Sequence, residues 1–177
     1  MHARHLLIGF AAAVLAGGVG AGPAHEHGVA RLDVAVDRGR VVLALDTPLD
    51  NLLGFEHAPR SDAEREKAAA LVARLRAADE LFRIDTAAGC TLARVVLDAP
   101  ALGLGRALAA SAGKEGHADL EAQFEFTCKA GARAGFLEHG LFEAFAPLKR
   151  LDLQVATPRG QMRATLRRPQ SRLALAR

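Results

Sequence analysis

Hydrophobic and polar residues alternate in two adjacent stretches near the start of the chain. Every second residue from 30 to 36 is apolar, and so is every second residue from 41 to 45, which is the period of strands with one buried face. Arg38 and Gly39 separate the two stretches and have the composition of a turn. Residues 29–46 therefore predict a β-hairpin, which ends at Pro48.

The same alternation predicts four more strands, in residues 90–96, 120–128, 151–155 and 162–166. Residues 158–160, with the sequence Pro-Arg-Gly, favour a turn between the last two. The pattern places Cys90, Leu92 and Val96 on one apolar face, and Cys128 on the apolar face of its own segment. We therefore expect both cysteines to point into the core.

One helix is clearly indicated. Ser61 and Glu64 have the spacing of a capping box. The apolar residues that follow recur at helical intervals, and they are Leu71, Leu75, Ala78 and Phe82. The pattern predicts an amphipathic helix over residues 62–80 and a short helical turn in residues 141–148. The glycine-rich residues 99–118 predict a long flexible loop, or a frayed helix at 106–111.

Strands dominate these predictions, and short turns join them. The pattern predicts a mainly β or α+β fold: an antiparallel β-sandwich or curled sheet with one inserted amphipathic helix at about residues 62–80. With 177 residues, half of them hydrophobic, the chain is long enough for one core. We expect residues 25–177 to form a single β-rich domain.

The first 24 residues have the three parts of a signal peptide. Arg4 supplies the positive charge, residues 6–16 form an apolar run, and small residues precede a cleavage site after Ala24 or after Ala21. The apolar run is too short for a stable membrane anchor. We therefore expect a periplasmic protein with no stable membrane insertion after cleavage.

Composition excludes several classes of function. The chain has 23 Lys and Arg against 20 Asp and Glu, and it contains no Trp or Tyr, so we expect no nucleic-acid partner. The spacings typical of metalloproteases, serine hydrolases, phosphate-binding loops and calcium loops do not occur. We therefore expect no catalytic activity.

Two cysteines, Cys90 and Cys128, are present in this exported chain. Because oxidising compartments favour disulfides and an even count leaves no thiol over, we expect one disulfide between them. The alternative, a pair of metal-binding thiolates, is disfavoured because the chain has no Cys-x-x-Cys spacing.

Histidines with acidic or histidine neighbours are the best candidates for chemistry. In an extended chain His25 and His27 would point to the same side, so both could bind one ion. His117, Asp119 and Glu121 repeat this geometry, and His57 lies beside an acidic residue just before the predicted helix. Imidazole with carboxylate suits zinc. Each group taken alone is also compatible with ordinary surface residues.

A copper or nickel site is an alternative that depends on where the signal peptide is cut. If His25 is the new terminus, its amine, two backbone amides and His27 form a square-planar donor set.

Four segments together resemble the ZrgA-like family of zinc-regulated periplasmic proteins. They are HEHG running into ARLDV (residues 25–34), LLGFEHAP (52–59), HADLEA leading to FTC (117–128), and LFEAF followed by LDLQV and GQ (141–161). The resemblance implies a zinc-binding protein that assists zinc uptake, with a zinc-transport component as a partner. The candidate metal ligands in the matching segments are His25, His27, His57, His117, Asp119 and Glu121.

The chain departs from this family in one place. Many relatives carry a tract rich in His, Asp and Glu before the segment that matches His117, whereas residues 103–116 here have only three charged residues. High-capacity zinc binding is therefore not expected. The rival hypothesis is a protein-interaction module in which the histidines have no metal role.

Overall fold

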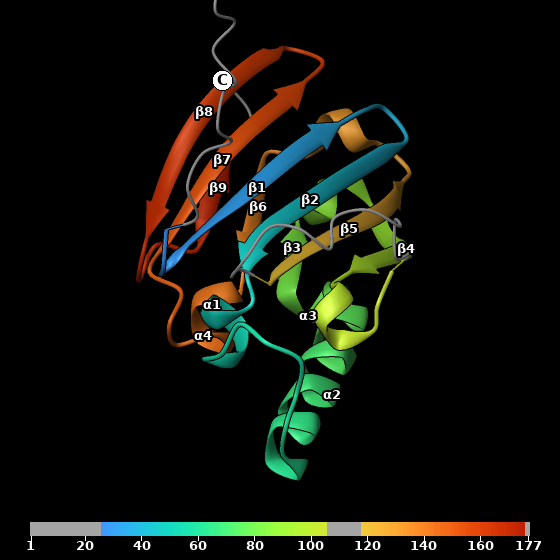
Figure 1. Ribbon diagram of the computed structural model, residues 1–177. Coiled ribbons are helices and arrows are strands. Elements are labelled where there is room, and N and C mark those ends of the chain that lie inside the picture. Colours follow the sequence, from blue (N-terminus) through green and yellow to red (C-terminus); the bar gives the residue numbers. More distant parts are fainter. Residues whose placement is uncertain (1–25, 106–117, 176–177) are drawn as a thin grey trace, which may run out of the picture.

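The structure is a computed structural model that describes residues 26–105 and 118–175. The predicted signal peptide and the predicted frayed helix at residues 106–111 lie outside the described residues. The described part of the chain forms two β-sheets and a few helices (Figure 1).

The larger sheet has six strands in the order β4-β5-β2-β1-β7-β8. Its strands are β1 (Val29–Val36), β2 (Arg40–Pro48), β4 (Cys90–Asp98), β5 (Asp119–Cys128), β7 (Arg150–Thr157) and β8 (Gly160–Arg167). The β1–β2 hairpin lies at the centre, and Pro48 is the last residue of β2. The predicted turn at Pro158 joins β7 to β8.

The smaller sheet has three short strands in the order β3-β6-β9 and lies behind the larger one (Figure 1). Its strands are β3 (Phe82–Ile84), β6 (Phe136–His139) and β9 (Arg172–Ala174). Phe82 on β3 and Phe124 on β5 join the two layers, with ring centroids 5.1 Å apart. The outer face of the large sheet is covered by no helix or strand of the described segments.

Short helices close the ends of the core. They are α1 (Asp50–Leu53), α2 (Asp62–Arg76), α3 (Ala78–Leu81) and α4 (Leu141–Ala144), with single 3₁₀ turns η1 (Thr86–Ala88), η2 (Pro100–Leu102) and η3 (Gly131–Arg133). α4 confirms the predicted helical turn. None of the helices in the described segments is long and apolar enough to cross a membrane.

The predicted fold class is confirmed: the described chain is rich in strands, with two sheets and few helices. One pairing is parallel, that of β1 with β7, and all the others are antiparallel. The chain between β2 and β7 supplies β3, β4, β5 and β6 before it returns to the free side of β1. This long connection is what permits a parallel pair.

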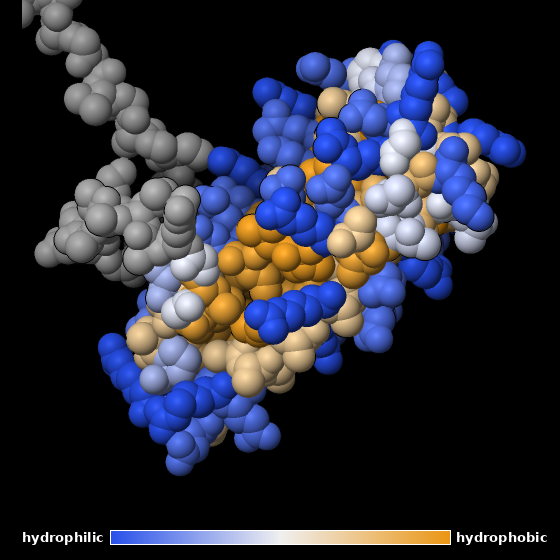
Figure 2. Space-filling model, turned by 90° about the vertical axis from the view of Figure 1, so that its right-hand side faces the viewer, coloured by the Kyte–Doolittle hydropathy of each residue, from blue (hydrophilic) through white to orange (hydrophobic). Residues whose placement is uncertain are grey.

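The prediction for the apolar face of β4 is wrong at Val96. A β-bulge shifts the register with β5 between Leu92 and Arg94, so the residues after it change faces. Val96 is 40% exposed, whereas Val95 and Leu97 pack against the core. β4 is an edge strand, and hydrophobic side chains gather on the side of the molecule that it borders (Figure 2).

The predicted helix over residues 62–80 is two helices, broken at Ala77. Its start is as predicted, because the Ser61 hydroxyl accepts a hydrogen bond from the Glu64 N–H at 3.2 Å. Ala77 has non-helical backbone angles, and α3 then leads directly into β3. The change of direction buries Leu81 and Phe82, so tertiary packing overrides the helical pattern here.

The predicted disulfide is confirmed. Cys90 and Cys128 occupy directly opposed positions on β4 and β5, and their sulfur atoms are bonded. The bond joins the first residue of β4 to the last residue of β5, so it closes a loop over 38 positions.

Replacing both cysteines by alanine is expected to lower the free energy of unfolding by about 3–4 kcal/mol, because the unfolded chain regains the entropy of an open loop. Urea unfolding followed by circular dichroism measures this. A variant with an unchanged unfolding free energy would contradict this role.

His139 is a buried histidine in the core. Its side chain is 5% exposed, and its ring meets the Phe142 ring edge-on at 4.8 Å. Burial lowers the pKa of His139 to about 4, from 6.5. The unfolded chain therefore binds a proton between pH 6.5 and pH 4 that the folded chain does not.

Stability is consequently expected to fall as the pH drops from 6.5 towards 4, by about 1–3 kcal/mol from this residue. His139→Gln should lose this part of the pH dependence, whereas His57→Gln, at a more exposed loop position, should keep it. Unfolding titrations at pH 7 and pH 4.5 measure both. Equal pH dependence in wild type and His139→Gln would refute the assignment.

Candidate metal centre

The β1–β2 ladder brings two distant parts of the chain together at one end of the large sheet. Arg31 pairs with Asp46, and the ladder runs from this pair to Val36 and Val41 without a shift in register. His27 lies in the turn before β1, and Asp50 is the first residue of α1, which follows β2. Figure 1 shows the start of β1 and α1 at the same end of the large sheet.

Three side chains converge at this point. Nδ1 of His27 lies 2.8 Å from Oδ2 of Asp50, and Nε2 of the same ring lies 3.9 Å from Oε1 of Glu56. Their potential ligand atoms all lie within 4.8 Å of one another, the one group of three such residues in the described segments. The His27 side chain is 65% exposed, and the Glu56 side chain 17%.

A tight turn presents His27. The Val29 N–H donates to the Glu26 carbonyl at 3.1 Å, and Gly28 has the left-handed angle φ = 80°, which favours glycine. The Glu26 carboxylate is held away from the site by Arg150 on β7, at 2.8 Å. The side chains of Glu26 and His27 therefore have different partners, although the two residues are adjacent in the chain.

Glu56 reaches the site because α1 ends abruptly. Gly54 takes a left-handed angle, φ = 79°, and its N–H donates to the Asp50 carbonyl at 2.9 Å. Phe55 then packs against the core. Glu56 follows directly, so its carboxylate lies beside the His27 ring.

The two carboxylates make this corner attractive to a cation. The hydrogen bond to Asp50, and then the negative charge of Glu56, raise the pKa of His27 above its usual value. A proton on His27 and a bound metal ion would both neutralise these charges. The two therefore compete for the same imidazole.

The geometry fits a small divalent ion such as zinc. Ligand atoms at 2.0–2.1 Å from a tetrahedral zinc ion lie about 3.3 Å from one another. Nε2 of His27 and Oε1 of Glu56 lie 3.9 Å apart, so a small side-chain movement would bring this pair to that separation. One imidazole with carboxylates is also a donor set that zinc accepts.

Two of the predicted ligands are placed elsewhere. His57 turns away from the group: its Nδ1 lies 3.0 Å from the Ala58 carbonyl, and its ring stacks on Phe55 with centroids 5.0 Å apart. Glu121 lies in the middle of the outer face, opposite Asp46 and Asp98. Neither belongs to the group of three around His27.

Asp119 is likewise outside the group of three around His27. It opens β5 opposite Pro48, and the Leu49 N–H donates to the Ala118 carbonyl at 2.8 Å, so the ladder extends towards Asp50. His25 and His117, the remaining predicted ligands, lie outside the described residues. The predicted pairing of His25 with His27 therefore stays a prediction; in the described residues the chain turns at His27 and Gly28.

Asp50 and Glu56 were not predicted as ligands. Both lie far from His27 in sequence, and the β1–β2 hairpin brings the chain at Asp50 back beside the start of β1. The predicted turn at Arg38 and Gly39 implies the register of this hairpin, because residues at equal distances from a two-residue turn face one another in a hairpin. The sequence therefore indicates that the chain just after Pro48 returns to the start of the hairpin, near His27.

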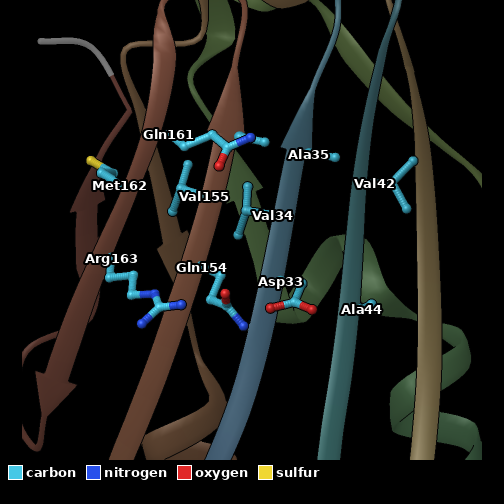
Figure 3. Close-up of a pocket in the computed structure, with 11 residues that line it drawn as sticks. Asp33, Val34, Ala35, Val42, Ala44, Gln154, Val155, Gln161, Met162 and Arg163 are labelled. Atoms are coloured by element: carbon cyan, nitrogen blue, oxygen red, sulfur yellow. The ribbon is translucent and has the colours of Figure 1, made fainter.

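A separate hollow of about 540 Å³ lies on the outer face of the large sheet (Figure 3). Its floor is made of small side chains, among them Ala35 and Ala44, and its polar groups Asp33, Gln154 and Arg163 lie in one row across β1, β7 and β8. It contains one carboxylate and no imidazole. Its donor set is therefore unlike that of a zinc site.

Comparison with known proteins agrees with the chemistry of the His27 corner. Residues 24–175 match the model of a family described as ZrgA family zinc uptake protein. The search of curated proteins found no match. Because the match covers the whole described part of the chain, the protein belongs to the ZrgA family of zinc uptake proteins.

Proposed function

We propose that this protein is a periplasmic, non-catalytic accessory protein of zinc uptake that binds zinc at the His27 corner. The observation that carries the proposal is the convergence of His27, Asp50 and Glu56 at the end of the β1–β2 hairpin. Family membership supports zinc as the cargo. The ion would be handed on to a zinc-transport component.

The hydrogen bond between His27 and Asp50 defines which nitrogen of the His27 ring is free to bind a metal ion. At 2.8 Å, Asp50 accepts the proton of Nδ1, so Nε2 carries the lone pair and faces Glu56. A carboxylate that holds the far side of a ligating imidazole is the usual support of zinc-binding histidines. We assign Nε2 of His27 and the Glu56 carboxylate as ligands, and Asp50 as the group that orients the ring.

His117 is the next ligand that we propose. It precedes Ala118 in the chain, and Ala118 is hydrogen-bonded to Leu49, the neighbour of Asp50. The proposal follows from this connection along the chain and from the sequence pattern. A set of three ligands leaves one zinc position open, and an open position with an exposed His27 favours release to a partner.

The periplasmic location rests on the predicted signal peptide. The Cys90–Cys128 disulfide supports it, because disulfides persist in oxidising compartments and are rare in the cytosol.

The mature protein is expected to bind about one zinc ion with micromolar affinity or better. His27→Ala and Glu56→Gln should each weaken binding at least tenfold, because each removes a ligand. Calorimetry with a competing chelator measures these affinities. His57→Ala is the matched control: it removes an imidazole from the same loop as Glu56 and should leave the affinity unchanged.

Two further variants sharpen this test. Asp50→Asn keeps an oxygen that accepts the Nδ1 proton, so it should weaken binding less than Asp50→Ala. The proposal fails if wild type binds zinc only at millimolar concentrations, or if His57→Ala weakens binding as much as His27→Ala. The interaction-module hypothesis would then be the better explanation.

Zinc binding should weaken as the pH falls from 7.5 to 5.5. Asp50 and Glu56 raise the pKa of His27, so protons compete more strongly with the metal for its imidazole as the pH falls. Calorimetry at both pH values measures the change, while circular dichroism confirms that the protein is folded. The same affinity at both pH values would argue against a histidine ligand.

A further inference from the structure

Asn51 is the second residue of α1, and its side chain is completely buried, with 0% exposure. It makes three hydrogen bonds. Its Oδ1 accepts the Gly28 N–H at 2.5 Å, and its Nδ2 donates to the Val29 carbonyl at 2.8 Å and to the Thr47 hydroxyl at 3.0 Å. Buried polar side chains are costly unless paired, and Asn51 uses both its acceptor and its donors.

Two of these hydrogen bonds hold the backbone directly after His27. Asn51 itself directly follows Asp50. One buried side chain therefore links the two backbone segments that carry the His27–Asp50 hydrogen bond. The His27 ring is mostly exposed, so its position depends on its backbone more than on packing.

We propose that Asn51 is a positioning residue of the metal centre. The inference rests on the proposed function and adds to it a residue that does not contact the ion. An amide suits this role because it both accepts from an N–H and donates to a carbonyl. A carboxylate at this position could only accept, and an apolar side chain could do neither.

The experiment compares Asn51 variants with a variant of its third partner. Asn51→Leu removes all three hydrogen bonds at similar volume. Asn51→Ser leaves room for water, and it keeps the test available if Asn51→Leu does not fold. Thr47→Val is the matched control, because Thr47 is equally buried and bonded to Asn51, yet its hydroxyl bonds to Asn51 and Pro48 and not to the backbone of Gly28 or Val29.

Zinc affinity is measured by chelator competition, folding by circular dichroism, and coordination by the visible spectrum of the Co²⁺-loaded protein. The Asn51 variants are expected to bind zinc at least tenfold more weakly and to change the Co²⁺ spectrum, since supporting residues of metal sites have effects of this size. Thr47→Val is expected to bind zinc within about twofold of wild type.

Folded Asn51 variants that bind zinc like wild type, with the same Co²⁺ spectrum, would overturn the positioning role alone. An equal loss in Thr47→Val would also overturn it, because the effect would then follow general stability. Failure of wild type itself to bind zinc would instead overturn the proposed function and this inference together.

Discussion

The antiparallel register between β1 and β2 is the constraint on which the rest of the structure depends. These strands form the centre of the six-stranded sheet, and their buried residues, such as Leu32 and Leu43, fill the middle of the core. A slip of one residue would turn these side chains to solvent, so burial fixes the register. The same register brings the start of α1 next to the turn before β1, where His27 is hydrogen-bonded to Asp50, so the core helps to position the candidate metal centre.

This arrangement explains why an exposed histidine can be held in a defined orientation. The His27 ring packs little, yet both of its neighbours are held: Arg150 bonds the Glu26 carboxylate, and Asn51 accepts the Gly28 N–H. The ring then needs only the Asp50 hydrogen bond to direct Nε2 towards Glu56. A centre built in this way combines defined geometry with access from solvent, which suits a protein that binds an ion and gives it up again.

Local sequence patterns predicted the parts of the fold that depend on local chemistry: the hairpin, the helix start at Ser61 and the disulfide. The bulge before Arg94 and the helix break at Ala77 leave no local signal, because packing between distant segments decides both. The strands of the small sheet have only three or four residues, too few for a period to appear. At the site, His27 could be predicted from its neighbours, whereas Asp50 and Glu56 depend on the hairpin register and on the end of α1.

The central claim is that zinc binds between His27 and Glu56 at the end of the hairpin. Anomalous diffraction at the zinc absorption edge, from crystals of the zinc-loaded mature protein, tests it most directly. The account predicts an anomalous peak about 2.0–2.2 Å from Nε2 of His27 and from a carboxylate oxygen of Glu56. A fully occupied zinc ion elsewhere on the protein, with none at this corner, would contradict the account.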